Sequence, residues 1–189
     1  MEIQHGVNTQ KLGEFVRHAA SNPQEVQLEL RTRSTYEGTC AHSLAEIKSY
    51  QVGGQEIERS TREYTLPFGG WREVLEQAGW VGAVDRMEPI EVALSALASC
   101  INVGISINAL AHGVDIESLE THVKVDFNPG VLFGLQGVDE SDTVFSNMRA
   151  EIRVSAETDE ARIQEWARRA PVFALVALPQ DIDIDVHRQ

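Results

Sequence analysis

Cysteine is nearly absent from this sequence, whose 189 residues include only Cys40 and Cys100. Two cysteines cannot form the disulfide framework of a small secreted protein, so we expect a reducing compartment. The first ten residues, MEIQHGVNTQ, lack the basic segment and apolar run of a secretion signal. Serine and asparagine interrupt the longest apolar stretch, which argues against a membrane-spanning helix. These absences predict a cytoplasmic protein that does not associate with a membrane.

Basic residues are also in short supply. The chain has 16 Lys and Arg against 29 Asp and Glu, a formal net charge of −13 at pH 7. Binding to nucleic acid depends on clustered cations that neutralise phosphates, so we expect no nucleic-acid partner. The six histidines show no metal-ligand spacing and the paired glycines no phosphate-loop pattern, so we expect neither a metal nor a cofactor.

The most continuous apolar segment, residues 87–113, predicts one long helix. Pro89 suits the first turn because its missing N–H would be unpaired there, and Gly113 suits the end because glycine adopts a positive φ. Between them the only charged residue is Glu91. A helix so apolar must be covered by other elements, so we expect it to be buried on nearly every side.

The two faces of this helix differ. One narrow stripe carries small or weakly polar side chains that would let another helix approach closely; at 3.6 residues per turn its members are Glu91, Ser95, Ser99, Asn102 and Ser106. Cys100 falls roughly opposite this stripe. Cys100 is the candidate functional residue. If it lines a pocket, its thiol can act as a nucleophile; if it is enclosed in the core, it is inert and behaves as a small hydrophobic side chain.

The rest of the chain alternates between helical and strand-like periods. Helical spacing predicts helices at residues 9–21, 71–80 and 159–170. Asn8 or Thr9 would cap the first of them, and Thr158 the last. A period of two predicts strands at residues 26–33, 119–127, 148–154 and 182–186, and strand-like stretches at 40–52 and 55–66. Gly53-Gly54 predicts a hairpin turn between the last two stretches. Residues 26–66 would then form a three-stranded antiparallel meander.

This order of elements predicts an α+β fold in which antiparallel sheets surround the long buried helix. Residues 1–189 would form a single domain, with residues 1–25 as a peripheral N-terminal helical arm. One small sheet cannot cover a helix that is apolar on all sides. A homodimer in which two copies share their long helices would cover it.

The long helix also resembles the central motif of the OsmC-like proteins, the family that includes the organic hydroperoxide resistance proteins. The likeness is carried by Pro89-Ile90-Glu91, by Ala93-Leu94-Ser95-Ala96-Leu97-Ala98-Ser99-Cys100, by Val103-Gly104 and by Ala111-His112-Gly113-Val114. Further along, Phe133-Gly134-Leu135 and Arg169-Ala170-Pro171-Val172-Phe173 are similar to a subgroup with a longer N-terminus. The resemblance spans residues 26–186.

The resemblance implies an OsmC-like fold, an intertwined homodimer and a role in the response to oxidative stress. In the members that are peroxidases, two cysteines reduce small organic hydroperoxides, with an arginine and a glutamate beside the reactive sulfur. Cys100 matches the cysteine that attacks the peroxide. Arg31 and Arg33, on one face of the first strand, are the candidates for the arginine.

Three positions depart from the peroxidase pattern. The catalytic glutamate would follow the proline directly, but Ile90 stands there, and Glu91 lies on the far side of the helix from the cysteine. The resolving cysteine would stand just before Pro171, where the chain has Arg169 and Ala170. The arginine, the third position, has no exact match.

Two hypotheses follow for the function. In the first, the protein is a thiol-dependent organic hydroperoxide reductase in which Cys100 forms a sulfenic acid that an external thiol, or Cys40, resolves. Because a thiol attacks peroxide as the thiolate, this needs a cation from a strand or from the partner subunit. In the second, the protein is a non-catalytic dimer that binds a small apolar ligand between its subunits, and Cys100 is inert.

Overall fold

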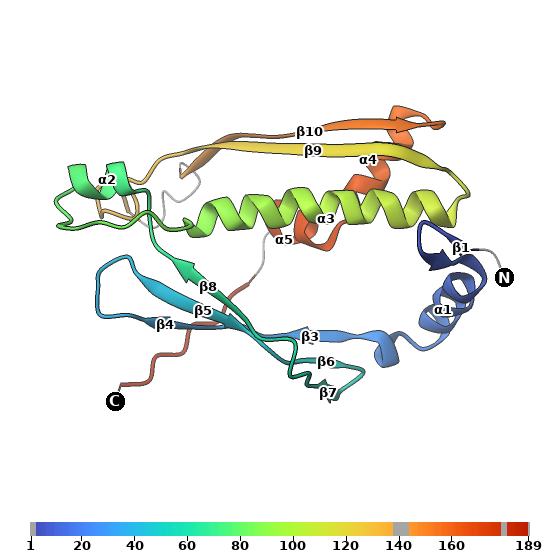
Figure 1. Ribbon diagram of the computed structural model, residues 1–189, viewed down its shortest axis with the longest axis horizontal. Helices are drawn as coiled ribbons and strands as arrows, with labels where there is room; N and C mark the ends of the chain where they lie inside the picture. Colours follow the sequence, from blue (N-terminus) through green and yellow to red (C-terminus); the bar gives the residue numbers. More distant parts are fainter. Residues whose placement is uncertain (1–2, 138–143, 179–180, 189) are drawn as a thin grey trace. The chain divides into compact units, whose positions relative to one another are not determined.

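The structure is a computed structural model that describes residues 3–137, 144–178 and 181–188. It has the predicted α+β composition, with antiparallel sheets and one long helix (Figure 1). The chain divides into two compact units, which cover residues 1–93 and residues 94–189.

The first unit begins with a hairpin and a helix. Strands β1 (Ile3–Gln4) and β2 (Val7–Asn8) pair antiparallel, and α1 (Thr9–Ser21) follows. The Asn8 side chain accepts a hydrogen bond of 2.9 Å from a backbone N–H in the first turn of α1. The predicted helix is therefore confirmed, and Asn8 is the cap of the two candidates, Asn8 and Thr9. A short 3₁₀ helix, η1 (Pro23–Val26), leads into the sheets.

The predicted meander is present, but each of its strands is interrupted. The six resulting strands are β3 (Leu28–Leu30), β4 (Arg33–Tyr36), β5 (Ser43–Ile47), β6 (Tyr50–Val52), β7 (Gln55–Ile57) and β8 (Tyr64–Phe68). They form two antiparallel sheets, with the orders β3-β6-β7 and β4-β5-β8 (Figure 1). The hairpin turn at Gly53-Gly54 is confirmed by φ values of +54° and +77°. The single strand predicted for residues 26–33 is wrong, because its start belongs to η1 and residues 31–32 interrupt the pairing.

The last of these strands runs further than the sequence indicates. Pro67 lies inside β8, an edge strand, where the missing N–H of proline is tolerated. Gly69 follows, and a Cβ at this position would lie only 2.8 Å from Cβ of Arg86, too close for any other residue. The predicted short helix is present as α2 (Arg72–Gln77), and it buries Leu75.

The predicted long helix is α3 (Pro89–Ala111), and both of its predicted ends are confirmed. Gly113, just after the helix, has a φ of +68°. At the start, the Glu88 carboxylate accepts a hydrogen bond of 2.5 Å from the N–H of Ile90, and the Glu91 carboxylate accepts one of 3.1 Å from the N–H of Glu88. This reciprocal capping box satisfies backbone donors that a helix start leaves free.

The second unit combines a two-stranded ribbon with two helices. Strands β9 (Ile116–Phe127) and β10 (Phe145–Ala156) pair antiparallel along most of their length. Along β9 the residues alternate between half-buried and exposed over the predicted strand, residues 119–127. Helices α4 (Glu160–Arg168) and α5 (Pro171–Ala177) follow.

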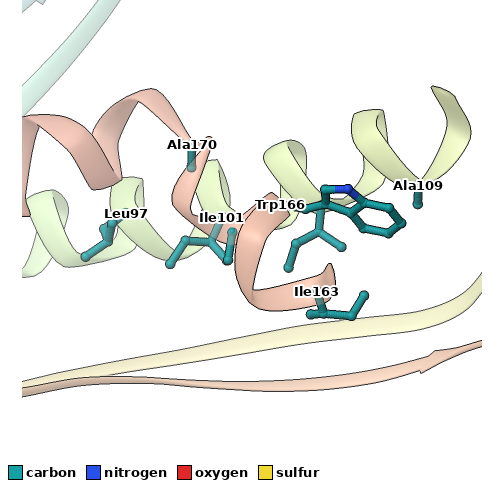
Figure 2. Close-up of a cluster of buried hydrophobic side chains, with 8 residues drawn as sticks. Leu97, Ile101, Ala109, Ile163, Trp166 and Ala170 are labelled. Atoms are coloured by element: carbon teal, nitrogen blue, oxygen red, sulfur yellow. The ribbon is translucent and has the colours of Figure 1, made fainter. Parts of the chain in front are cut away.

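The core of the second unit lies between α3, α4 and the connection that joins α4 to α5 (Figure 2). Ile105 and Ala170 have no exposed surface, and Trp166 keeps 1%. The full set of buried residues is Leu97, Ile101, Ile105 and Ala109 from α3, Ile163, Trp166 and Ala167 from α4, and Ala170. Apolar residues of β9 and β10 pack, partly buried, against this cluster.

Within the second unit, only one face of α3 is buried. Val103 and Ile107 each keep 52% of their surface exposed, and Ser95, Ser99 and Ser106 are exposed as well. The second unit by itself therefore does not provide the expected burial on nearly every side. By its length and its mean hydropathy of 1.8, α3 could also cross a membrane, a criterion that core helices of soluble proteins meet equally.

Two local predictions near the C-terminus are wrong. The cap of α4 is Asp159 rather than Thr158, since the Asp159 carboxylate accepts a hydrogen bond of 2.8 Å from the N–H of Arg162. Residues 182–186 form no strand, and Ile184 is 83% exposed. An alternating segment becomes a strand only where a neighbouring strand accepts its backbone hydrogen bonds, and the described residues provide none for it.

Replacing Ile105 by alanine tests the core of the second unit. Because Ile105 is fully buried, Ile105→Ala leaves a cavity and should lower the free energy of unfolding by about 2 to 5 kcal/mol. Val81→Ala is the control, since Val81 is fully exposed, and should change it by less than about 0.5 kcal/mol. Urea denaturation measures both values, and equal losses would contradict this description of the core.

Candidate functional site

Cys100 lies in the middle of α3 beside the core cluster. Its side chain is half-buried, and its sulfur accepts a hydrogen bond from the backbone N–H of Val172 at 3.5 Å. Val172 is in the first turn of α5, where backbone N–H groups have no acceptor within the helix. The sulfur therefore faces a backbone donor, an arrangement that stabilises negative charge.

Gly104, one turn further along α3, allows this contact. A Cβ at this position would lie 3.1 Å from the carbonyl oxygen of Trp166 and 3.4 Å from Cβ of Ala170. Glycine in the middle of a helix costs about 0.5 to 1 kcal/mol relative to alanine, and the close approach accounts for its presence. The α4–α5 connection thereby packs directly on α3 and brings the N–H of Val172 to Cys100.

Arg169 ties the same connection to α3. Its Nη1 donates a hydrogen bond of 2.7 Å to Oδ1 of Asn108, and its Nη2 pairs with Glu165. Asn108 in turn donates from Nδ2 to the carbonyl oxygen of Gly104 at 2.7 Å. Asn108 is about 12 Å along the helix from Cys100, so Arg169 positions the connection and does not act on the sulfur. The sequence carries no signal for Asn108, because its partner comes from a distant segment.

No cysteine occupies the place expected for a resolving residue. Ala170 stands there, fully buried against α3. Cys40 is exposed and belongs to the first unit, where its carbonyl oxygen accepts a hydrogen bond of 3.0 Å from the indole N–H of Trp80. Resolution by Cys40 stays a prediction.

Glu91 has a structural task at the start of α3. Its carboxylate completes the capping box, about 13 Å along the helix from Cys100. Capping by itself therefore explains why position 91 is acidic, and no catalytic role is needed. Ile90, which stands at the position of the catalytic glutamate, donates its backbone N–H to the same box.

The two candidate arginines belong to the first unit and differ in their surroundings. Arg31 forms ion pairs with Glu29 at 2.6 Å and with Glu56 at 3.2 Å. The hydrogen bond to Glu29 raises the pKa of Arg31 above its usual value. Arg33 begins β4, is exposed, and has no ion pair within the described part of the chain. Their pairing with Cys100 stays a prediction.

Two histidines of the second unit, His112 and His122, have local partners. The ring of His112 lies 5.4 Å from the ring of Trp166, and Nε2 of His122 lies 3.0 Å from a carboxylate oxygen of Glu120. Across residues 3–137, 144–178 and 181–188, no three His, Cys, Asp or Glu side chains gather in a way that could hold a metal ion.

Comparison with known proteins agrees with the motif around Cys100. The model of the OsmC-like protein family matches residues 82–185, which confirms the resemblance. No curated protein matches the chain. An OsmC like protein from Mycoplasma pneumoniae is similar in structure, with 14% identity, a TM-score of 0.49, and coverage of 79% of this chain and 88% of that chain. A protein from Psychrobacter arcticus 273-4, named as a proposed osmotic stress induced and detoxification response protein, has 17% identity, a TM-score of 0.46, and coverage of 77% and 86%.

The pKa of the Glu56 carboxylate provides a test of the surroundings of Arg31. Hydrogen bonds from Ser49 and Gln51, together with the charge of Arg31, lower the pKa of Glu56 below its usual value. The resulting stabilisation is present above the pKa of the unfolded chain and is lost as the pH falls through the lowered value. We expect Ser49→Ala to raise the Glu56 pKa more than Arg31→Ala does. A carboxyl NMR titration measures this, and a pKa that neither variant changes would contradict the geometry.

Proposed function

The chain belongs to the OsmC-like protein family, and from this premise we propose that it is a thiol-dependent organic hydroperoxide reductase in which Cys100 attacks the peroxide. The observation that carries the proposal is the hydrogen bond from the N–H of Val172 to the Cys100 sulfur. An inert cysteine in an apolar core needs no such donor, whereas a nucleophilic thiolate is stabilised by it. The half-buried side chain also supports attack on a small molecule.

The reaction proceeds in two steps. The Cys100 thiol first loses its proton, and the thiolate attacks the terminal oxygen of the hydroperoxide. An S–O bond forms, the O–O bond breaks, and the alcohol leaves with a proton, so that the cysteine becomes a sulfenic acid. An external dithiol then attacks this sulfur, releases water and forms a mixed disulfide. The second thiol of the reductant then attacks the reductant's own sulfur in the mixed disulfide. This step frees the Cys100 thiol and releases the reductant as an intramolecular disulfide.

An external reductant is part of the proposal because of the residue at the resolving position. Ala170, which stands there, cannot form a disulfide with Cys100. Cys40 is the other cysteine of the chain, and its exposed side chain makes it the internal alternative. Activity of a Cys40 variant with the dithiol supplied distinguishes the two routes.

A cation beside the sulfur would stabilise both the thiolate and the leaving alkoxide. We favour Arg33 over Arg31 for this role, acting in the same chain or across a dimer. Arg31 already shares its charge with Glu29 and Glu56, whereas Arg33 has no ion pair among the described residues. A guanidinium without a carboxylate partner has more of its charge available to the sulfur.

Peroxide consumption tests the proposal. With a dithiol supplied, the wild type should reduce tert-butyl hydroperoxide and a fatty-acid hydroperoxide. Cys100→Ser should abolish the reaction because serine forms no sulfenic acid, and Cys40→Ser is the matched control that should retain it. Arg33→Ala should lower kcat/KM by about tenfold or more, and by more than Arg31→Ala does.

Mass spectrometry of Cys100 after one equivalent of hydroperoxide identifies the product. A sulfenic or sulfinic acid on Cys100 supports the proposal. A wild type that consumes neither hydroperoxide and leaves Cys100 unmodified would rule it out.

We further propose that the protein is a homodimer in which the exposed face of α3 packs against a second copy. Val103 and Ile107 supply half-exposed apolar surface on this face, and Ser99 and Ser106 are small enough for another helix to approach. Self-association would complete the cover that a helix of this composition needs.

Ile107→Lys tests this interface. A charge on the half-exposed face should shift the protein to the monomer, as measured by sedimentation velocity, because pairing would bury it without a partner. Val81→Lys, at a fully exposed position of the first unit, is the control and should leave the dimer intact. Circular dichroism is the control for whether both variants are folded. A wild type that is monomeric at micromolar concentration would contradict the interface.

A non-catalytic dimer that binds a small apolar ligand between its subunits is the second candidate. Ala170 favours it, because the chain lacks an internal resolving cysteine at the expected place. Its signature would be an apolar ligand that co-purifies with the protein, together with resistance of Cys100 to alkylation and no peroxide consumption.

A further inference from the structure

A polar pocket lies where the strands of the first unit are interrupted. Ile47 pairs with Tyr64 and Tyr50 pairs with Ile57, so between these pairs residues 48–49 face the longer segment 58–63. The longer segment cannot lie flat against two residues and therefore loops outward. The pocket has a volume of about 560 Å³, and its walls come from these two segments alone.

Arg62 is held in this pocket by aromatic rings instead of by an acid. Its guanidinium carbon lies 4.9 Å from the ring centre of Tyr50 and 5.6 Å from that of Tyr64. Its Nε is buried and has no hydrogen-bond partner among the described residues. Five other arginines of this acidic chain do pair with glutamates, namely Arg31, Arg72, Arg86, Arg153 and Arg169. Arg62 is thus a fixed cation without an ion pair in the described part of the chain.

The remaining charges make the pocket weakly basic. Lys48 and Arg59 line it with Arg62, and Glu58 and Glu63 oppose them. The backbone N–H of Arg62 donates to the carbonyl oxygen of Arg59 at 2.9 Å, a turn that brings the two arginines close together. Lys48 lies 3.9 Å from Glu63 and is partly neutralised by it. Three cations against two acids leave one positive charge, in a chain whose net charge is −13.

We propose that this pocket binds a small carboxylate and that Arg62 is its anchor. A guanidinium matches a carboxylate through two parallel N–H···O bonds, and the two tyrosine rings already hold this one in place. One net positive charge suits a monoanion, whereas a phosphate dianion would meet the acids of the wall with excess negative charge. All lining residues belong to the first unit, so the site does not depend on the activity proposed for Cys100.

An NMR titration of the full-length, ¹⁵N-labelled protein tests the site. The backbone amides of Tyr50 and Tyr64 should shift saturably on addition of acetate or octanoate, with sodium chloride used to keep the ionic strength constant. Arg62→Gln should weaken binding by about tenfold or more. Arg59→Gln keeps the cation between the rings and should weaken binding less. Arg17→Gln, on α1, is the matched control and should bind like the wild type.

Three results would overturn the proposal: no saturable shift, the same shift with chloride alone, or tighter binding of inorganic phosphate than of acetate. If circular dichroism shows that Arg62→Gln is unfolded, Arg62→Lys takes its place. That variant keeps the charge but loses the planar fork, so a folded Arg62→Lys protein should bind acetate more weakly than the wild type. Undiminished affinity in this variant would contradict the role of the guanidinium.

Discussion

The close approach of the α4–α5 connection to α3 at Gly104 is the contact on which the second unit depends. A Cβ at position 104 would lie 3.1 Å from the carbonyl oxygen of Trp166 and 3.4 Å from Cβ of Ala170, so a larger side chain would push the connection away from α3 by a few tenths of an ångström. The same approach seals the core around Trp166 and presents the N–H of Val172 to the Cys100 sulfur. Packing and the chemistry proposed for Cys100 therefore rest on one contact between helices.

Polar groups hold this contact in register. Asn108 bridges the carbonyl oxygen of Gly104 and the guanidinium of Arg169, and Arg169 also pairs with Glu165 on α4. Apolar packing by itself is non-directional and tolerates small slips of one helix along another. Two directional hydrogen bonds join residues 169–172 to α3, from Arg169 to Asn108 and from Val172 to Cys100, and together they restrict such slips.

The distribution of charge gives the arginines different roles. In a chain with 29 acidic residues, five arginines pair with glutamates in the part of the chain that the structure describes. Arg31 and Arg169 are paired and support local structure. Arg33 and Arg62 have no ion pair among the described residues, and for each we propose an anionic partner: a thiolate for Arg33 and a carboxylate for Arg62.

Local signals predicted much of the secondary structure and little of the site. Pro89 and Gly113 act within one turn of their own positions, so the ends of α3 follow from the sequence, as does the Gly53-Gly54 hairpin. Residues 182–186 alternate like a strand, but a strand also needs a neighbour, which the pattern does not specify. The interruption of each strand of the meander escaped prediction for the same reason.

The sequence by itself determined the long helix, the α+β class, the family and the cysteine to ask about, because each depends on residues close together in the chain. Only the tertiary structure decided that Val172 donates to Cys100, that Asn108 meets Arg169, and that one face of α3 is left exposed. These features join segments about sixty or more residues apart, or depend on what covers a helix. Such contacts are settled by how whole elements pack, which no local pattern encodes.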